Sequence, residues 1–293
     1  MLKMTPDVQR LIKQVLREDV GSGDVTSRAV ISQDCRIRAR IIAKTPGIIA
    51  GARVAQRVFE TVDRRIRCRG VRTDGKRVRR GDAIMRLDGP AQGILTAERT
   101  ALNFLGHLSG IATLTHEFVR RVRPFRARIM DTRKTLPGLR DLEKYAVRVG
   151  GGLNHRQGLD EAVLIKTNHL KALASSEWRV ASQACIQAVI KKAKSMRPRR
   201  FVEIEVENFR EFTAALSARP DAILLDNWRL AQIKRAVALR HSSLITHHSS
   251  LLEVSGGITL DNVRAIARTG VDRISIGRLT HSAPALDVSL AVI

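Results

Sequence analysis

The second half of the chain contains six short apolar runs, and each ends on a polar or glycine-bearing cluster. Stretches of helical length with amphipathic spacing separate the runs, a pattern typical of repeated βα units and a parallel sheet. Because an α/β barrel places its active site at the C-terminal ends of its strands, the clusters mark a candidate site. The runs are Ile129-Met130, Val163-Leu164-Ile165, Val202 to Val206, Ile223-Leu224-Leu225, Leu252-Glu253-Val254 and Ile274-Ser275-Ile276.

The first third of the chain lacks this alternation and is typical of an α+β segment. Thr5 and Pro6 read as an N-cap followed by proline at the first helical position, and predict a helix that ends near Gly21. Alternating apolar and basic residues predict a half-buried strand over Cys35 to Ala43 with its basic face outward. The spacing further on predicts a helix over Val54 to Val62 and short strands over Ile66 to Arg86. A helical stretch is predicted over Ala91 to Val122, with bends at Gly106 and Gly110.

A chain of 293 residues is long enough for two unequal domains. We expect an N-terminal α/β domain over residues 1–107, a barrel domain over 108–281, and a C-terminal segment, 282–293, that returns to the first domain. A closed barrel usually has more than six strands. Either a further strand lies in a weakly patterned stretch such as Ser243-Leu244-Ile245, or the barrel is incomplete.

Composition narrows the class of protein. The apolar content of 44% is ordinary, and no apolar run approaches the roughly 18 residues that a membrane span needs. With no signal-peptide pattern at the start, we expect a cytoplasmic protein that does not engage membranes. Three cysteines far apart in the sequence argue against a disulfide framework and against a zinc site.

The formal net charge of +24 is the unusual compositional feature. Lysine and arginine concentrate in Arg64 to Arg80 and in Lys191 to Arg200. Such charge can bind nucleic acid or steer small polyanions toward a cleft. Since aromatic residues make up only 3% of the chain and no recognised nucleic-acid motif is present, we expect no specific nucleic-acid partner, and most of these charges are expected to form a solvated surface.

Two basic clusters suit an anionic substrate. Arg133 and Lys134 directly follow the first run and precede Pro-Gly, and a guanidinium with an ammonium group can bind carboxylate and phosphate together. A solvated basic loop is the alternative, which the strand-end position disfavours. A triple glycine followed by Asn154, His155 and Arg156 is the second cluster, and there a ligand could approach the backbone closely.

Acidic and glycine clusters complete the pattern. Glu205 and Asp226 end consecutive strands, so they could hold Mg²⁺ together with sugar hydroxyls, although either alone could simply offset nearby cations. Glu203 shares a strand face with Glu205 because strand side chains alternate with period two. Backbone N–H groups after Ser255-Gly256-Gly257 and Gly277-Arg278 could cradle a monophosphate.

Taken together, these segments resemble the quinolinate phosphoribosyltransferases, the decarboxylating type II phosphoribosyltransferases of NAD synthesis. The resemblance spans nearly the whole chain. The motifs that carry it are GSGDVTS from Gly21, AERTALNFL from Ala97, LSGIAT from Leu108, TRKTLPGLR from Thr132, EKYAVRVGGGLNHR from Glu143, LIKTNH from Leu164, VEIEVEN from Val202, LLDN from Leu224, EVSGGI from Glu253 and GVDRISIGRLTHSAPALD from Gly270.

The resemblance implies an N-terminal α/β sandwich, an incomplete α/β barrel of seven strands, and a homodimer with shared sites that could assemble further. Arg99 would reach the substrate dicarboxylate from the partner subunit. The other implied roles are dicarboxylate binding by Arg133, His155, Arg156 and Lys166, pyrophosphate contact by Lys134, ribose and Mg²⁺ contact by Glu205 and Asp226, and 5′-phosphate binding by Ser255, Gly256, Gly257 and Gly277, with His281 nearby.

The implied reaction joins the quinolinate nitrogen to ribose C1 of phosphoribosyl pyrophosphate, expels pyrophosphate and loses CO₂, giving nicotinate mononucleotide. Mg²⁺ is the implied cofactor, with no organic cofactor, because the quaternised ring nitrogen accepts the electrons of decarboxylation. The expected catalytic residues are Lys134, Lys166, Glu205 and Asp226.

One position departs from the family pattern. The usual Lys-Asp-Asn-His is Lys166-Thr167-Asn168-His169 here, so a carboxylate is missing beside the site. Pyrophosphorylase-like proteins associated with molybdate transport share part of the pattern, but Glu143-Lys144-Tyr145 and Asn154-His155-Arg156 favour quinolinate. A barrel relic that binds nucleic acid is a third alternative, which the retained site cations disfavour.

Overall fold

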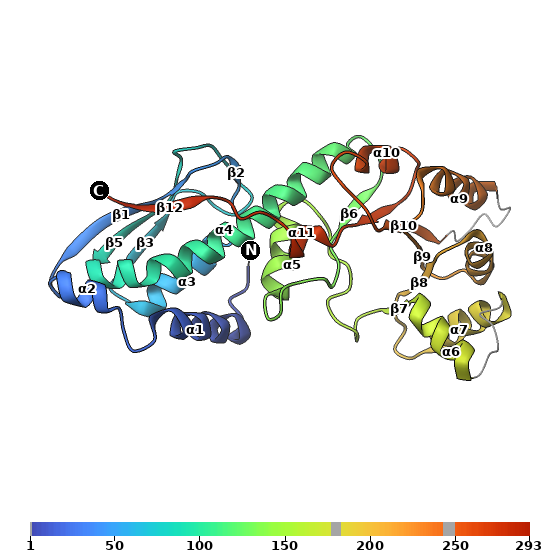
Figure 1. Cartoon of the computed structure of the whole chain (residues 1–293), viewed down its shortest axis with the longest axis horizontal. Helices are drawn as coiled ribbons and strands as arrows, with labels where there is room; N and C mark the ends of the chain where they lie inside the picture. The colour runs from blue at the N-terminus through green and yellow to red at the C-terminus, as the bar shows by residue number, and fades with distance from the viewer. Residues whose placement is uncertain (1, 177–182, 243–249) are drawn as a thin grey trace. The chain divides into compact units, whose positions relative to one another are not determined.

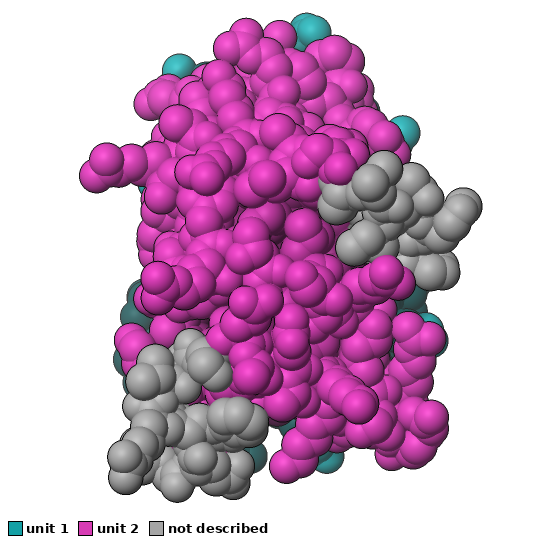
Figure 2. Space-filling model, turned by 90° about the vertical axis from the view of Figure 1, so that its right-hand side faces the viewer, with its two compact units in different colours: residues 1–116, 135–151, 278–293 teal, residues 117–134, 152–277 magenta. Residues whose placement is uncertain are grey.

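The computed structural model describes residues 2–176, 183–242 and 250–293. The candidate strand at Ser243-Leu244-Ile245 lies outside the described residues. The chain forms two compact units, coloured separately in Figure 2. Residues 108–116, 135–151 and 278–281, which the sequence-based expectation gave to the barrel domain, belong to unit 1 in this division. Unit 1 comprises Met1–His116, Thr135–Gly151 and Arg278–Ile293, and unit 2 comprises Glu117–Lys134 and Gly152–Gly277.

Unit 1 is built on a four-stranded antiparallel sheet with the strand order β12-β1-β5-β3. The edge strand β12 lies near the C-terminus and pairs antiparallel with β1, so the last part of the chain completes the sheet formed by the first part. A separate two-stranded ribbon joins β2 and β4. The bounds are β1 Arg36–Ala43, β2 Gly47–Ile48, β3 Arg67–Gly70, β4 Arg77–Val78, β5 Ala83–Pro90 and β12 Val288–Val292.

Strand β1 confirms the predicted alternation. Ala39, Ile41 and Ala43 are fully buried and contribute to the core of unit 1. Arg36, Arg38 and Arg40, which alternate with the inward-facing residues, are exposed, so the basic face of the strand points to solvent as its period-two pattern predicts.

The helices of unit 1 also begin and end where the sequence indicates. The Thr5 hydroxyl accepts the Val8 N–H at 3.4 Å, and the first helix ends at Gly21, whose φ of 54° favours glycine. Asp24 caps the next helix by accepting the Ser27 N–H at 2.9 Å. The bounds are α1 Pro6–Val20, α2 Val25–Val30, α3 Ala52–Val62, α5 Arg140–Val149 and α11 Arg278–His281.

The long helix α4 runs continuously from Ala91 to Val122, through both glycines at which a bend was predicted. These glycines permit close packing instead. A Cβ added to Gly106 would lie 2.9 Å from the Leu286 carbonyl oxygen, and one added to Gly110 would lie 2.1 Å from that of Pro284. The chain returning from the C-terminus therefore packs against the backbone of α4 in unit 1.

Unit 2 contains a parallel sheet with the order β6-β11-β10-β9-β8-β7, flanked by helices (Figure 1). These six strands are the six apolar runs predicted from the sequence. A chain with parallel strands and intervening helices is an α/β protein, as expected. The bounds are β6 Arg128–Met130, β7 Val163–Ile165, β8 Val202–Val206, β9 Ala222–Asp226, β10 Leu251–Ser255, β11 Arg273–Ser275, α6 Thr167–Ser176, α7 Gln183–Ser195, α8 Phe209–Ala218, α9 Leu230–Ser242 and α10 Val263–Ala267.

Leu153 adds a single parallel bridge to the edge strand β6. Its N–H donates to the Ile129 carbonyl at 2.9 Å, and its carbonyl accepts the Asp131 N–H at 3.1 Å. The described part of unit 2 therefore has six strands and one bridging residue beside β6, where the resemblance implied seven strands. Across residues 2–176, 183–242 and 250–293, we found no helix with the length and apolar character of a membrane span.

Candidate active site

Asp131 follows β6 and ties this strand end to a second chain segment. The side chain is fully buried and accepts the His155 N–H at 2.8 Å. It also accepts a hydrogen bond from the Asn154 side-chain amide. A buried carboxylate that accepts two hydrogen bonds holds its donors in a fixed position, so Asp131 fixes the start of the Asn154-His155-Arg156 segment beside the end of β6.

His155 has both ring nitrogens engaged by the protein. Nδ1 accepts the Arg156 N–H at 2.8 Å, which places the imidazole proton on Nε2, and Nε2 donates to Glu203 Oε2 at 2.9 Å. A second buried carboxylate, that of Glu253, lies 3.5 Å from Nε2.

These three side chains could be taken for a metal site, since one ligand atom from each lies within 4.8 Å of the others. However, an Nε2 that carries a proton has no lone pair for a metal ion, and a metal-ligating histidine normally donates its other N–H rather than accepting there. His155, Glu203 and Glu253 therefore form a cluster in which His155 is hydrogen-bonded to Glu203 and Glu253 lies beside them, and we call it the His155 cluster.

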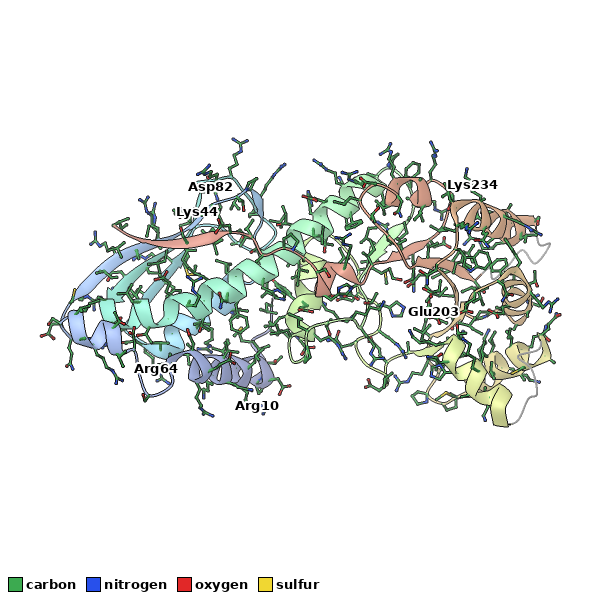
Figure 3. All side chains as sticks on the ribbon, in the orientation of Figure 1. Arg10, Lys44, Arg64, Asp82, Glu203 and Lys234 are labelled. Atoms are coloured by element: carbon green, nitrogen blue, oxygen red, sulfur yellow. The ribbon has the colours of Figure 1, made fainter. Side chains whose placement is uncertain are left out.

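The two carboxylates of the His155 cluster repel each other, and Arg273, whose guanidinium lies 3.8 Å from Glu253 Oε2, offsets only part of that repulsion. Glu203 and Glu253 are almost completely buried, and Figure 3 labels Glu203 among the strands of unit 2. Burial, followed by the charge of Glu203, raises the pKa of Glu253 to about 7, while His155 acts in the opposite direction. The protonated form of Glu253 is therefore favoured in the folded protein over a wider pH range than in a free carboxyl group.

Arg156 and Arg133 present two guanidinium groups at the same end of the sheet. One nitrogen of Arg156 donates to the Ala162 carbonyl at 2.9 Å, which fixes the side chain. Burial, and next the charge of Arg133, lowers the pKa of Arg156. Two neighbouring guanidinium groups that repel each other form a receptor for a ligand with two negative charges.

Lys166 and Thr167 converge on Glu205. The Lys166 Nζ lies 3.7 Å from Glu205 Oε2. The Thr167 hydroxyl donates to Glu205 Oε1 at 3.0 Å, and the Thr167 N–H approaches the same oxygen at 3.3 Å. The residue that departs from the family pattern therefore orients a predicted site carboxylate.

Asp226 ends β9, next to the strand that carries Glu205. Burial and then the charge of Glu205 raise the pKa of Asp226, while Lys166 and Lys134 lower it. Lys134 follows β6, and Lys166 follows β7, so charges from strands at both edges of the sheet act on one carboxylate. This part of unit 2 can bind a metal ion or a cationic group beside an anionic one.

The glycine segment after β10 is shaped by its neighbour. Gly256 has φ 90°, and an added Cβ would lie 2.0 Å from the Asn227 Oδ1, so only glycine fits. Gly257 has φ 61° and open space at the Cβ position. The next helix, α10, begins only at Val263, because Thr259 and Asn262 form a turn first. Ser255 and Gly277 end or follow the adjacent strands β10 and β11.

Two predicted site residues belong to unit 1, whereas the others belong to unit 2. Arg99 is exposed on α4. His281 is the exposed last residue of α11, and its Nδ1 lies 2.6 Å from the Ser282 Oγ.

The sequence did not predict that Asp131 accepts hydrogen bonds from Asn154 and His155, that Glu253 lies beside His155, or that His155 pairs with Glu203. The useful signal was an acidic residue inside an otherwise apolar strand, since burying a carboxylate is unfavourable without a partner. A buried acidic residue also occurs in unit 1, on helix α5, where that signal does not apply: Glu143 is fully buried, lies 2.9 Å from His107 Nε2 and accepts the Leu136 N–H at 3.2 Å.

A parallel α/β unit with arginine, lysine and carboxylate groups at its strand ends defines a protein that handles anionic substrates. The chain matches the descriptions "Quinolinate phosphoribosyl transferase, N-terminal domain" over residues 24–109 and "C-terminal domain" over residues 111–291. It therefore belongs to the quinolinate phosphoribosyltransferase family.

Individual relatives agree with this assignment. The chain is 40% identical over 285 residues to the nicotinate-nucleotide pyrophosphorylase [carboxylating] of Mycobacterium leprae, with 95% of each chain covered. It is 40% identical to a probable enzyme of the same name from Bacillus subtilis, covering 97% of this chain and 93% of the relative. The crystal structure of NadC from Streptococcus pyogenes superposes with a TM-score of 0.88 at 37% identity, with 100% of both chains covered.

Proposed function

We propose that this protein transfers the phosphoribosyl group of phosphoribosyl pyrophosphate to quinolinate, with decarboxylation, to give nicotinate mononucleotide in NAD biosynthesis. It is accordingly a pentosyltransferase. The observation that carries the proposal is the gathering of two guanidinium groups, two ammonium groups and two carboxylates at the strand ends of unit 2, in a chain of this family.

Arg133 and Arg156 bind the two carboxylates of quinolinate. The neighbouring guanidinium charges repel each other, as the lowered pKa of Arg156 indicates, and a dianion relieves that repulsion. His155 acts through Arg156, because its Nδ1 accepts the Arg156 N–H and its Nε2–H is held by Glu203. Lys166 adds a third cation near this position.

Glu205 and Asp226 face the ribose, where positive charge develops at C1 as the bond to pyrophosphate breaks. Nearby carboxylates stabilise that charge. The same two residues fit Mg²⁺, directly or through water, because carboxylate oxygens are its preferred ligands and because burial and then the charge of Glu205 raise the pKa of Asp226, so that a cation nearby would stabilise its ionised form. When bound, Mg²⁺ neutralises charge on the leaving pyrophosphate, and Lys134 assists from the end of β6.

The second half of the reaction needs no organic cofactor. Once the ring nitrogen carries the ribose, it is a cation adjacent to the carbon that bears the 2-carboxylate. The bond to CO₂ breaks, its electron pair stays on that ring carbon beside the positive nitrogen, and the carbon takes a proton. Ser255, Gly256, Gly257 and Gly277 receive the 5′-phosphate through backbone N–H groups.

We propose further that the protein works as a cytoplasmic homodimer with shared sites. Arg99 is exposed on α4 and outside unit 2, which suits a residue that reaches the substrate of a partner subunit. His281 is proposed to lie near the phosphate.

The test is product analysis. Purified protein is incubated with quinolinate labelled in the 2-carboxylate, phosphoribosyl pyrophosphate and Mg²⁺. Nicotinate mononucleotide and labelled CO₂ should appear in equal amounts. Nucleotide formation without CO₂ release, or release without the nucleotide, would contradict the proposed reaction.

A further inference from the structure

The solvent face of the unit 1 sheet carries six exposed arginines, which we call the arginine face. They come from three adjacent strands, and residues two apart on a strand share this face because side chains alternate. Lys44 directly follows β1 and Asp82 directly precedes β5, and both are labelled in Figure 3. The members of the face are Arg36, Arg38 and Arg40 on β1, Arg86 on β5, and Arg67 and Arg69 on β3.

One row across these strands is balanced by a carboxylate. Asp88 on β5 stands between Arg38 on β1 and Arg67 on β3. Its oxygens accept from Arg36 at 2.9 Å and from Arg38 at 3.3 Å. These guanidinium groups, with the hydrogen bond from Arg36 first, hold the pKa of Asp88 below its ordinary value.

The adjacent row of side chains across the same three strands contains no carboxylate to offset its positive charge. Arg40 on β1 stands directly opposite Arg86 on β5, which stands opposite Arg69 on β3. Directly opposed side chains have Cβ atoms about 5 Å apart, and like charges in that arrangement are destabilising. Within the part of the chain that the structure describes, these three side chains make no hydrogen bond or ion pair.

This row contributes nothing to the core, whose residues point to the other side of β1, and it belongs to a different unit from the cations at the strand ends of unit 2. We propose that the arginine face binds the phosphate backbone of nucleic acid without reading its sequence. Three aligned guanidinium groups that oppose one another in the free protein become favourable when phosphates lie between them.

The chemistry of the face favours nucleic acid over other polyanions. All six cations are arginine, whose planar fork matches phosphate oxygens in pairs. Same-face residues follow at about 6.8 Å along a strand, and strands are about 4.8 Å apart, so the array can meet successive phosphates. The face holds no aromatic side chain that could stack on bases or insert into a bilayer, which indicates backbone contact alone.

The experiment measures binding of a short fluorescein-labelled duplex DNA, in two unrelated sequences, to the full chain as salt is raised. The test variant is Arg40→Gln with Arg69→Gln and Arg86→Gln. The control variant removes the same number of positive charges from the basic segment Lys191 to Arg200 in unit 2. Its substitutions, all at exposed residues, are Lys191→Gln, Lys192→Gln and Arg200→Gln.

The test variant should lose at least about tenfold in affinity for both sequences, and the slope of log K against log salt should fall by about three, one for each phosphate contact. The control variant should bind within about twofold of the parent. The test variant should keep the parent kcat and a melting temperature at least as high, since it relieves like-charge opposition.

Three outcomes would overturn the proposal. Equal losses in the two variants would mean that total charge alone binds DNA. Parent-like binding by the test variant would mean that the arginine face is only solvated. Vesicles of phosphatidylserine and phosphatidylcholine that bind the parent and not the test variant, without any matching change in DNA binding, would assign the face to membranes instead.

Discussion

The raised pKa of Glu253 in the His155 cluster leads to a quantitative prediction about Glu253→Gln. Glutamine keeps the shape of the side chain and removes its charge. The folded protein raises the pKa of Glu253 from 4.5 to about 7, which corresponds to about 3 kcal/mol of unfavourable interaction with the ionised form. That unfavourable interaction is absent when Glu253 is protonated.

The sign of the pH dependence follows from the direction of the shift. Because the folded-state pKa exceeds the unfolded one, the folded protein retains the proton longer. Stability linked to Glu253 is fully present below about pH 4.5, falls as pH rises toward 7, and is constant above that. Relative to the parent, Glu253→Gln should therefore gain roughly 2 to 3 kcal/mol of unfolding free energy between pH 5 and pH 8.

The assay is urea unfolding at the two pH values, followed by tryptophan fluorescence. Trp228 is buried in unit 2 and its Nε1 donates to the Val206 carbonyl at 3.0 Å, so its signal reports the unit that contains the cluster. Glu203→Gln should shrink the pH dependence, because it removes the second cause of the raised pKa. Glu207→Gln, exposed at the end of the same segment, should leave it unchanged.

A difference between parent and Glu253→Gln that stays constant from pH 5 to pH 8 would refute the reasoning. It would mean that Glu253 ionises at its ordinary pKa despite burial, and that the repulsion assigned to the two carboxylates of the His155 cluster is not there.

Four further predictions concern the proposed active site. Thr167→Val removes the hydroxyl that donates to Glu205, and the loss of about 1 kcal/mol of hydrogen bonding should lower kcat about fivefold. The control Thr167→Ser keeps the hydroxyl and should keep the parent kcat. An unchanged kcat in Thr167→Val would mean that this contact does not orient Glu205. Thr167→Asp, which sets a second carboxylate against Glu205, should lower the Mg²⁺ concentration needed for half-maximal rate. Arg99→Ala and Arg156→Ala chains should each be inactive alone, but a mixture of the two should recover about a quarter of the parent activity. Half of the randomly formed dimers contain one chain of each kind, and one of the two sites in such a dimer has both arginines intact. No recovery after verified subunit exchange would argue against shared sites. Gly256→Ala should raise the KM for phosphoribosyl pyrophosphate at least about tenfold, while Gly70→Ala, which has open space at its Cβ, should leave it unaltered.

Much of the fold follows from local patterns in the sequence. The six strands of the parallel sheet are short apolar runs, and each is followed by a polar or glycine-bearing cluster, so both their type and their ends can be predicted. The first helix carries its own cap and stop signals at Thr5 and Gly21. The role of Gly106 and Gly110 could not be predicted, because it depends on a segment about 180 residues further along the chain.

The candidate site divides in the same way. Arg133, Lys134, Glu205 and Asp226 stand at strand ends and can be found from position alone. The partners of His155 cannot, since Glu203 and Glu253 lie inside buried strands and meet the imidazole only when three separate segments pack together. The bridge at Leu153 is a single residue and leaves no periodic signal.

The most direct measurement is turnover of quinolinate against nicotinate, each with phosphoribosyl pyrophosphate and Mg²⁺. Nicotinate has one carboxylate, so it leaves a guanidinium of the Arg133 and Arg156 pair without its partner, at about 1 to 3 kcal/mol or more for a charged group. We predict that quinolinate yields nicotinate mononucleotide and that kcat/KM for nicotinate is lower by at least about tenfold. Equal turnover of the two substrates would contradict a site built for the dicarboxylate.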